Sequence, residues 1–242
     1  MNVYMTKQAR ILNRILHPYS RAPRRSHYPV IDKAQVLIRR ASTGSVGHLF
    51  QTHNGRPTSK WSHYLDIYDM HLEPIRNHKV HDSARVIEIG VAEGGSLEVW
   101  RKYFGPRSRI VGIDIAPQVQ GPLSNGIDLL IGSQSDPQIL KAACEILNSQ
   151  IDVVIDDGSH RGRDQIKTFE TLWPYLANGA VYIVEDLHTS YWAEFRGGPG
   201  RRGTFIEFAK LLVDDMHLDY HRRQRTQMGD TAARTQIGRA HV

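Results

Sequence analysis

The chain has 242 residues, a hydrophobic fraction of 40% and a formal net charge of +6, and this length suits one α/β domain with appendages. No apolar run approaches the roughly 18–20 residues that cross a bilayer. No signal-peptide core follows the first residue, so we expect a cytoplasmic protein without a membrane partner. The single cysteine, Cys144, excludes an intrachain disulfide framework and a multi-cysteine zinc site.

The positive charge is concentrated at the two ends of the chain. Residues 1–50 contain nine Lys and Arg residues against Asp32, a net charge of +8, and residues 221–242 contain five Arg residues against Asp230, a net charge of +4. The segment 51–220 carries 17 basic and 23 acidic residues, a net charge of −6. Basic ends suit acidic partners. Aromatic and basic residues do not interleave as they do in RNA-binding sheets, so nucleic acid is not a predicted partner.

We expect residues 1–57 to form a basic, helical N-terminal arm ahead of a domain at 58–220. Two partly amphipathic pieces, at 7–16 and 31–38, flank a break that is rich in proline and arginine, and their spacing predicts helices. Such an arm is a candidate for contacts in a homo-oligomer or for covering the functional site.

A predicted strand breaks into glycines within residues 85–95, which read RVIEIGVAEGG. Glycines that precede a helix leave backbone N–H groups free to approach a ligand. A second predicted strand ends on Asp114, at about the spacing of 20 residues where a ribose-binding acid belongs. Together the two signals predict a site for a nucleotide-like cofactor.

The glycine spacing favours one cofactor over another. Dinucleotide-binding loops read G-x-G-x-x-G, whereas this loop has Glu88, Gly90 and Gly94 in the spacing E-x-G-x-x-x-G-G, which is similar to motif I of class I S-adenosylmethionine (SAM) methyltransferases. An NAD(P)-dependent oxidoreductase is the alternative, although the chain lacks a Tyr-x-x-x-Lys pair. A glycine turn that binds nothing, or a SAM-binding fragment without catalysis, would also fit the loop.

Strands and helices alternate from residue 85 onward, which is typical of parallel βαβ units. We predict strands at 85–90, 109–114, 127–131, 151–155 and 181–184, and helices at 138–147, 165–176 and 205–215. The fold class is therefore α/β, a Rossmann-like doubly wound sheet, in which ligands bind at the carboxyl ends of the strands.

Three acidic residues follow two strands that we expect to be neighbours: Asp157 after one, and Glu185 and Asp186 after the other. Adjacent strands lie about 4.8 Å apart, so the carboxylates would repel one another unless a cation or a proton compensates them. Oxygen ligands suit Mg²⁺ first, then Mn²⁺ or Ca²⁺. His160 lies near enough to exchange a proton there at neutral pH. The alternative is an ordinary turn beside a solvated strand end.

Several motifs together resemble one family. The stretches IEIGVAEGGSLEVW, GIDI, IGSQSDP, IDDGSH and VYIVEDLHTSYW look like those of the metal-dependent sugar O-methyltransferases of macrolide biosynthesis and their cephalosporin hydroxylase-type relatives. The resemblance covers about residues 58–215. It implies transfer of a methyl group from SAM, with Mg²⁺, to a hydroxyl of a small-molecule acceptor such as a sugar of a glycosylated natural product.

The resemblance also implies roles for particular residues, which are carried over by motif position. The implied metal ligands are Asp157, Glu185 and Asp186, and the implied general base is His160. The implied cofactor-binding residues are Glu88, Gly90, Gly94, Asp114, Ser133, Gln134 and Asp156.

The end of the sequence is polar and without pattern over residues 221–242. A complete SAM-methyltransferase sheet has two more strands after residue 215, so we expect a C-terminally truncated domain. The last six residues, IGRAHV at 237–242, can be encoded by a common sequencing adapter, and we interpret them as adapter-encoded. This interpretation leaves the activity of the chain itself open.

Overall fold

The computed structural model describes residues 43–77 and 83–218. The chain divides into two compact units, residues 1–41 and 42–242, and every described residue belongs to the second. The helical pieces predicted at 7–16 and 31–38, and the tail at 221–242, lie outside the described residues.

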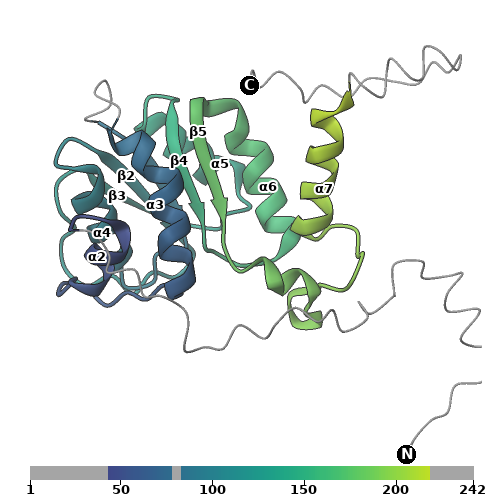
Figure 1. The fold of residues 1–242 in the computed structure, drawn as a ribbon, viewed down its shortest axis with the longest axis horizontal. Coiled ribbons are helices and arrows are strands. Elements are labelled where there is room, and N and C mark those ends of the chain that lie inside the picture. The colour runs from purple at the N-terminus through teal and green to yellow at the C-terminus, as the bar shows by residue number, and fades with distance from the viewer. Residues whose placement is uncertain (1–42, 78–82, 219–242) are drawn as a thin grey trace, which may run out of the picture. The chain divides into compact units, whose positions relative to one another are not determined.

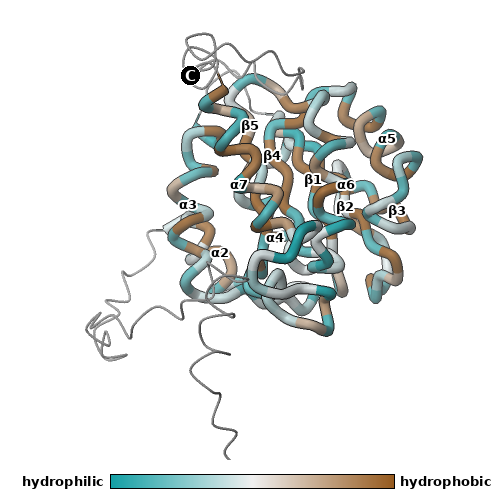
Figure 2. The backbone as a smooth tube through the Cα atoms, turned by 90° about the vertical axis from the view of Figure 1, so that its right-hand side faces the viewer, coloured by the Kyte–Doolittle hydropathy of each residue, from teal (hydrophilic) through white to brown (hydrophobic). Residues whose placement is uncertain are grey.

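Five parallel strands form one sheet in the order β3-β2-β1-β4-β5 (Figure 1). The strands are β1 (Arg85–Ile89), β2 (Arg109–Asp114), β3 (Ile127–Ile131), β4 (Ile151–Asp156) and β5 (Leu176–Val184). The central strands are rich in β-branched residues, and every residue of β4 is buried, as in a parallel sheet that is covered on both faces. Figure 2 shows how these hydrophobic segments gather in the sheet.

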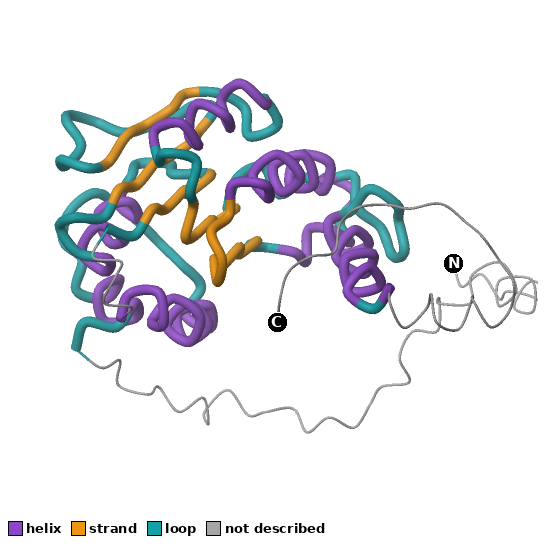
Figure 3. Tube along the Cα trace, turned by 90° about the horizontal axis from the view of Figure 1, so that it is seen from above, coloured by secondary structure: helices purple, strands orange, loops and turns teal. Residues whose placement is uncertain are grey.

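Helices cover the sheet on both sides (Figure 3). They are α2 (Val46–Gln51), α3 (Ser62–Asn77), α4 (Gly95–Phe104), α5 (Pro137–Ile146), α6 (Gly162–Leu172) and α7 (Phe205–Met216). One buried cluster joins α2, α3 and α4 to the sheet, and a second joins α5 and the end of α6 to the opposite face. The predicted doubly wound fold is confirmed. Cys144 is buried in the second cluster.

Three predicted boundaries were wrong by three residues or more, and the first is the start of helix α6, at Gly162 rather than at 165. Helix α6 ends at Leu172 rather than at 176, because Pro174 has no N–H to continue the α-helical hydrogen bonds, and a 3₁₀ turn follows at Trp173–Tyr175. Strand β5 begins at Leu176 rather than at 181, since Leu176 already pairs with Ile151. The residues around Gly179, whose φ is +78°, form an irregularity in the pairing rather than a turn ahead of the strand.

The described end of the predicted arm packs with the domain. Val46 of helix α2 is fully buried in the core cluster that includes α3 and α4, and its N–H donates to Asp69 Oδ1 at 2.7 Å. Within residues 43–77 and 83–218, no helix has the length and apolar character needed to cross a membrane.

Candidate active site at the carboxyl edge of the sheet

The glycine loop between β1 and α4 has positions that only glycine can occupy. Gly90 has φ +82°, and a Cβ atom there would lie 2.1 Å from the carbonyl oxygen of Asp157. Gly94 has φ +84°, and a Cβ on Gly95 would lie 2.3 Å from the carbonyl oxygen of Arg56. The loop therefore combines left-handed backbone with close packing against the backbone of Asp157 and Arg56, which only glycine allows.

Asp114, at the end of β2, is fixed to the glycine loop by its carboxylate. Its Oδ2 accepts hydrogen bonds from the N–H groups of Val91 at 2.9 Å and Ala92 at 3.0 Å, and its Oδ1 accepts one from Ala116 N–H at 2.9 Å. Three backbone donors hold the carboxylate in one orientation, and its oxygens keep lone pairs for further donors. This is the position expected of a ribose-binding acid.

Glu88 lies within β1, beneath the loop, and is fully buried. Its Oε2 accepts a hydrogen bond from the hydroxyl of Ser96 at 2.7 Å, whereas Oε1 has no hydrogen-bond partner among the described residues. Burial raises the pKa of Glu88 to about 7, although Lys60, with its Nζ 3.9 Å from Oε1, acts in the opposite direction. The unpaired oxygen of Glu88 thus lies toward Lys60.

Gln134 and Asp156 are buried and bind each other. The Gln134 amide nitrogen donates to Asp156 Oδ1 at 3.1 Å, and its carbonyl oxygen accepts from Ser159 N–H at 2.6 Å. Burial raises the pKa of Asp156 to about 7. Ser133 pairs with the hydroxyl of Ser135 at 2.9 Å. Gln134 and Asp156 therefore brace the turn after β4, and contact of all three predicted residues with a cofactor stays a prediction.

Strand pairing places the acidic residues at one edge. Asp157 N–H donates to Ile89 O at 2.9 Å, and Glu185 N–H donates to Asp156 O at 2.9 Å. The β1–β4–β5 pairing thus continues one residue past the strands and delivers Asp157 and Glu185 to the same end of the sheet.

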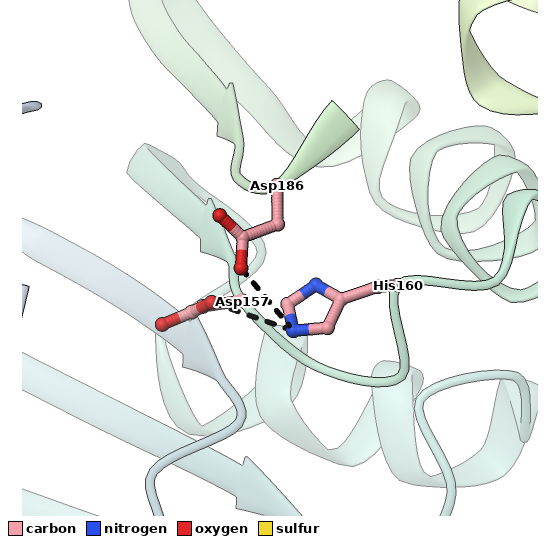
Figure 4. A group of neighbouring side chains, drawn as sticks. All are labelled: Asp157, His160 and Asp186. Atoms are coloured by element: carbon pink, nitrogen blue, oxygen red, sulfur yellow. Dashed lines mark ion pairs between the residues drawn. The ribbon is translucent and has the colours of Figure 1, made fainter. Parts of the chain in front are cut away.

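Asp157, His160 and Asp186 converge (Figure 4). His160 Nε2 lies 3.8 Å from Asp157 Oδ1 and 3.9 Å from Asp186 Oδ2, and one ligand atom from each residue lies within 4.8 Å of the others. His160 and Asp186 have φ values of +54° and +52°. Strained backbone of this kind persists where the surrounding structure enforces it, and it often accompanies function.

Glu185 has different partners from the other two predicted metal ligands. Its Oε1 lies 2.5 Å from Lys60 Nζ and also accepts a hydrogen bond from the hydroxyl of Tyr68. Lys60 Nζ lies 2.5 Å from Asp157 Oδ2 as well. The structure thus brings Asp157 and Asp186 to His160, whereas Glu185 is joined to Asp157 through Lys60.

Lys60, Tyr64 and Tyr68 are site residues that sequence reasoning missed. Burial alone would lower the pKa of Lys60, but the carboxylates of Glu88, Glu185 and Asp157 outweigh burial and raise it above its usual range. The Tyr64 hydroxyl donates to Asp186 Oδ1 at 2.9 Å. Burial, followed by this bond, raises the pKa of Tyr64 to about 12. The sequence does contain one signal for these residues. Tyr64 and Tyr68 are four residues apart, on one face of a helix, and buried tyrosine hydroxyls require polar partners.

A cavity of about 550 Å³ is lined by the two chain neighbours of His160 and by two residues of the 187–203 loop. Its lining residues are Ser159, Arg161, Glu194 and Phe195. The Phe195 ring lies edge-on to the His160 ring, with 6.2 Å between centroids. Tyr191 and Trp192, in the same loop, are 50% and 48% exposed, so these two aromatic residues are not part of the core.

The sheet, the glycine loop and the acid after β2 together define the fold class of the SAM-dependent methyltransferases. Residues 87–187 match the family model of a methyltransferase domain. Residues 87–187 are therefore similar to a methyltransferase domain, as the motifs predicted.

The curated relatives that this chain resembles are named as O-methyltransferases. The chain is 36% identical over 196 residues to 8-demethyl-8-(2-methoxy-alpha-L-rhamnosyl)-tetracenomycin-C 3'-O-methyltransferase of Streptomyces olivaceus, covering 76% of this chain and 48% of the relative. It is 34% identical over 157 residues to mycinamicin VI 2''-O-methyltransferase of Micromonospora griseorubida, covering 61% and 38%.

A solved structure agrees with these relatives. The MycE methyltransferase from the mycinamycin biosynthetic pathway, in complex with Mg and SAH, aligns with a TM-score of 0.60 and 30% identity, covering 72% of this chain and 48% of that one. The predicted resemblance is confirmed. The chain spans about half the length of the curated relatives that it matches most extensively.

Proposed function

We propose that this chain forms part of a SAM-dependent, Mg²⁺-assisted O-methyltransferase that acts on a hydroxyl of a small-molecule acceptor. The observation that carries the proposal is the convergence of His160, Asp157 and Asp186 beside a glycine loop that is fixed to Asp114. The methyltransferase-domain match favours this function over the oxidoreductase alternative.

The cluster fits a hard divalent cation. Carboxylate oxygens are the ligands that Mg²⁺ prefers, and one ligand atom from each of Asp157, His160 and Asp186 lies within 4.8 Å of the others. Asp157 and Asp186 would hold the ion, with Glu185 joining them once Lys60 moves away. When bound, Mg²⁺ lowers the pKa of a hydroxyl that it coordinates, and SAM supplies an electrophilic methyl group.

The residues of the chain would orient the reactants and take up a proton. Asp114 would accept the ribose hydroxyls of the cofactor, and Gly90 and Gly94, which have no side chain, would let the backbone of the loop approach the cofactor closely. The acceptor oxygen would take the methyl group as the sulfur–methyl bond of SAM breaks, which leaves S-adenosylhomocysteine, and its proton would pass to Nε2 of His160, the nitrogen that faces both aspartates. Holding acceptor and donor in line contributes through proximity.

The surroundings of His160 fit a sugar. The cavity combines the aromatic ring of Phe195 with the polar side chains of Ser159, Arg161 and Glu194, and apolar surface with a few polar groups is typical of small-molecule sites. Two adjacent hydroxyls, as in a vicinal diol, suit chelation by one ion. The relatives named for rhamnosyl and mycinamicin substrates support a sugar of a glycosylated natural product over a catechol.

Two measurements on the 242-residue chain test the proposal. Calorimetry with SAM, and with NAD as the competing cofactor, should give binding to SAM alone. Methyl transfer to a panel of rhamnosides, macrolide glycosides and catechols should be greatest on a glycoside. Absence of SAM binding would contradict the cofactor assignment, and SAM binding without product on any acceptor would indicate a binding fragment instead.

A further inference from the structure

We propose that Lys60 is a positioning residue that occupies part of the cation site, holding Asp157 and Glu185 together and leaving them when a divalent ion binds. This inference rests on the proposed function, because it concerns the same acidic cluster. It assigns a role to a residue from the segment that precedes α3, remote in sequence from both carboxylates.

The distances place the ammonium group where a shared ion would bind. Lys60 Nζ lies 2.5 Å from Asp157 Oδ2 and 2.5 Å from Glu185 Oε1, and its side chain is only 4% exposed. A divalent cation that took both oxygens as ligands would have to approach them more closely still, at about 2.0–2.1 Å for Mg²⁺. Two cations cannot share that space, so binding of the ion between these oxygens requires Lys60 to leave.

Asp157 connects the ammonium group to the histidine side of the cluster. One of its oxygens contacts Lys60, whereas the other lies 3.8 Å from His160 Nε2. The lysine and an ion bound with Asp186 would therefore compete for the charge of the same carboxylate. The long flexible stem of a lysine allows its ammonium to move without rearrangement of the backbone.

Loss of the ammonium would leave buried acids without a cation. Glu88 is fully buried and Glu185 is 4% exposed, and the Lys60 ammonium lies 3.9 Å from Glu88 and 2.5 Å from Glu185. An uncompensated buried carboxylate is strongly unfavourable. A protein without the Lys60 charge should therefore gain more from a divalent ion than the wild type does.

The test is a calorimetric titration of Mg²⁺ alone into the 242-residue chain, carried out with the wild type and with Lys60→Met. We expect Lys60→Met to bind Mg²⁺ at least about tenfold more tightly, about 1.4 kcal/mol, and to show a larger rise in Tm when Mg²⁺ is added. Lys60→Gln, which keeps a polar end, should change in the same direction. Arg85→Met is the matched control. Arg85 pairs with Asp152 at 2.9 Å, and both residues lie at the starts of their strands, away from the acidic cluster at the carboxyl ends. The Mg²⁺ affinity of Arg85→Met should therefore equal that of the wild type.

The outcomes separate this inference from the proposed function. Wild-type binding of Mg²⁺ with equal or weaker binding by both Lys60 variants overturns the role of Lys60 and leaves the metal site standing. Binding by neither the wild type nor the variants overturns both. Variants that fold only with Mg²⁺ support the inference, whereas variants that fail to fold even with Mg²⁺ overturn it, since the ion should replace the ammonium.

Discussion

Replacing Asp114 by asparagine tests whether Asp114 and the glycine loop bind the cofactor. The carboxylate accepts three backbone hydrogen bonds, two on Oδ2 and one on Oδ1. Asparagine has a single acceptor oxygen. In the orientation that keeps more bonds, this oxygen accepts from Val91 and Ala92 N–H, and the NH₂ group then faces Ala116 N–H, so that two donors oppose each other. Hydrogen bonds to charged groups contribute about 1.5–3 kcal/mol each, and we expect a loss of about 2 kcal/mol in the free energy of unfolding.

The same substitution should weaken SAM binding. An amide presents one acceptor where a carboxylate presents two, and the oxygen that remains already accepts two loop N–H groups. We expect the Kd for SAM to rise about 10- to 100-fold, equivalent to about 1.4–2.8 kcal/mol. Calorimetry measures this Kd, and urea unfolding measures the loss of stability.

A matched control separates this effect from a general loss of charge. Asp136 caps helix α5 by accepting Gln138 N–H at 2.8 Å, and asparagine caps helices as well as aspartate does. Asp136→Asn should therefore leave SAM affinity and stability near the wild-type values. A Kd of Asp114→Asn within twofold of wild type would refute the reasoning, because the acid would then not face the ribose.

Three further predictions concern the loop, the buried acid and the metal side. Gly90→Ala should lower the free energy of unfolding by at least about 2 kcal/mol, since alanine at positive φ costs about 1–2 kcal/mol and its Cβ would overlap the Asp157 carbonyl; a loss below 1 kcal/mol in urea titrations would contradict it. Burial raises the pKa of Glu88 from 4.5 to about 7, so the folded state binds the proton more tightly, and Glu88 should lower stability by up to about 1.4 kcal/mol per pH unit as pH rises from about 4.5 to 7. Asp156, whose pKa burial also raises to about 7, adds to the same slope, so Glu88→Gln should reduce the slope in unfolding curves without abolishing it, and an unchanged slope would contradict the prediction. Tyr64→Phe removes the donor to Asp186 and should weaken Mg²⁺ binding about tenfold by calorimetry while costing about 1 kcal/mol of stability; unaltered Mg²⁺ affinity would remove Asp186 from the ligand set.

Local patterns were sufficient to predict the sheet and the gathering of acidic residues at one of its edges. The β-branched runs and the glycine spacing predicted β1, β2 and β4 within a residue, because those signals depend on neighbouring residues alone. The rule that ligands bind at the carboxyl ends of parallel strands then brought Asp157, Glu185 and Asp186 to one edge. Pairing between β4 and β5 is the structural basis of that success.

The role of Lys60 could not be predicted in the same way. It depends on contacts with residues 97 and 125 positions further along the chain, and no local pattern encodes the packing that produces them. The hydroxyls of Tyr64 and Tyr68 bond to Asp186 and Glu185, which are more than 110 positions further along the chain. Gln134 and Asp156 pair through a similar long-range contact, so sequence spacing alone did not reveal that they bind each other.

In the proposed reaction, a divalent ion and His160 together activate an acceptor hydroxyl at this edge of the sheet. The most direct measurement is the rate of methyl transfer from SAM to a glycoside acceptor, with and without EDTA, for the wild type and His160→Ala. We predict that EDTA abolishes turnover, that added Mg²⁺ restores it, and that His160→Ala loses at least about 100-fold in kcat. Turnover that is unaffected by EDTA, or full activity of His160→Ala, would contradict the account.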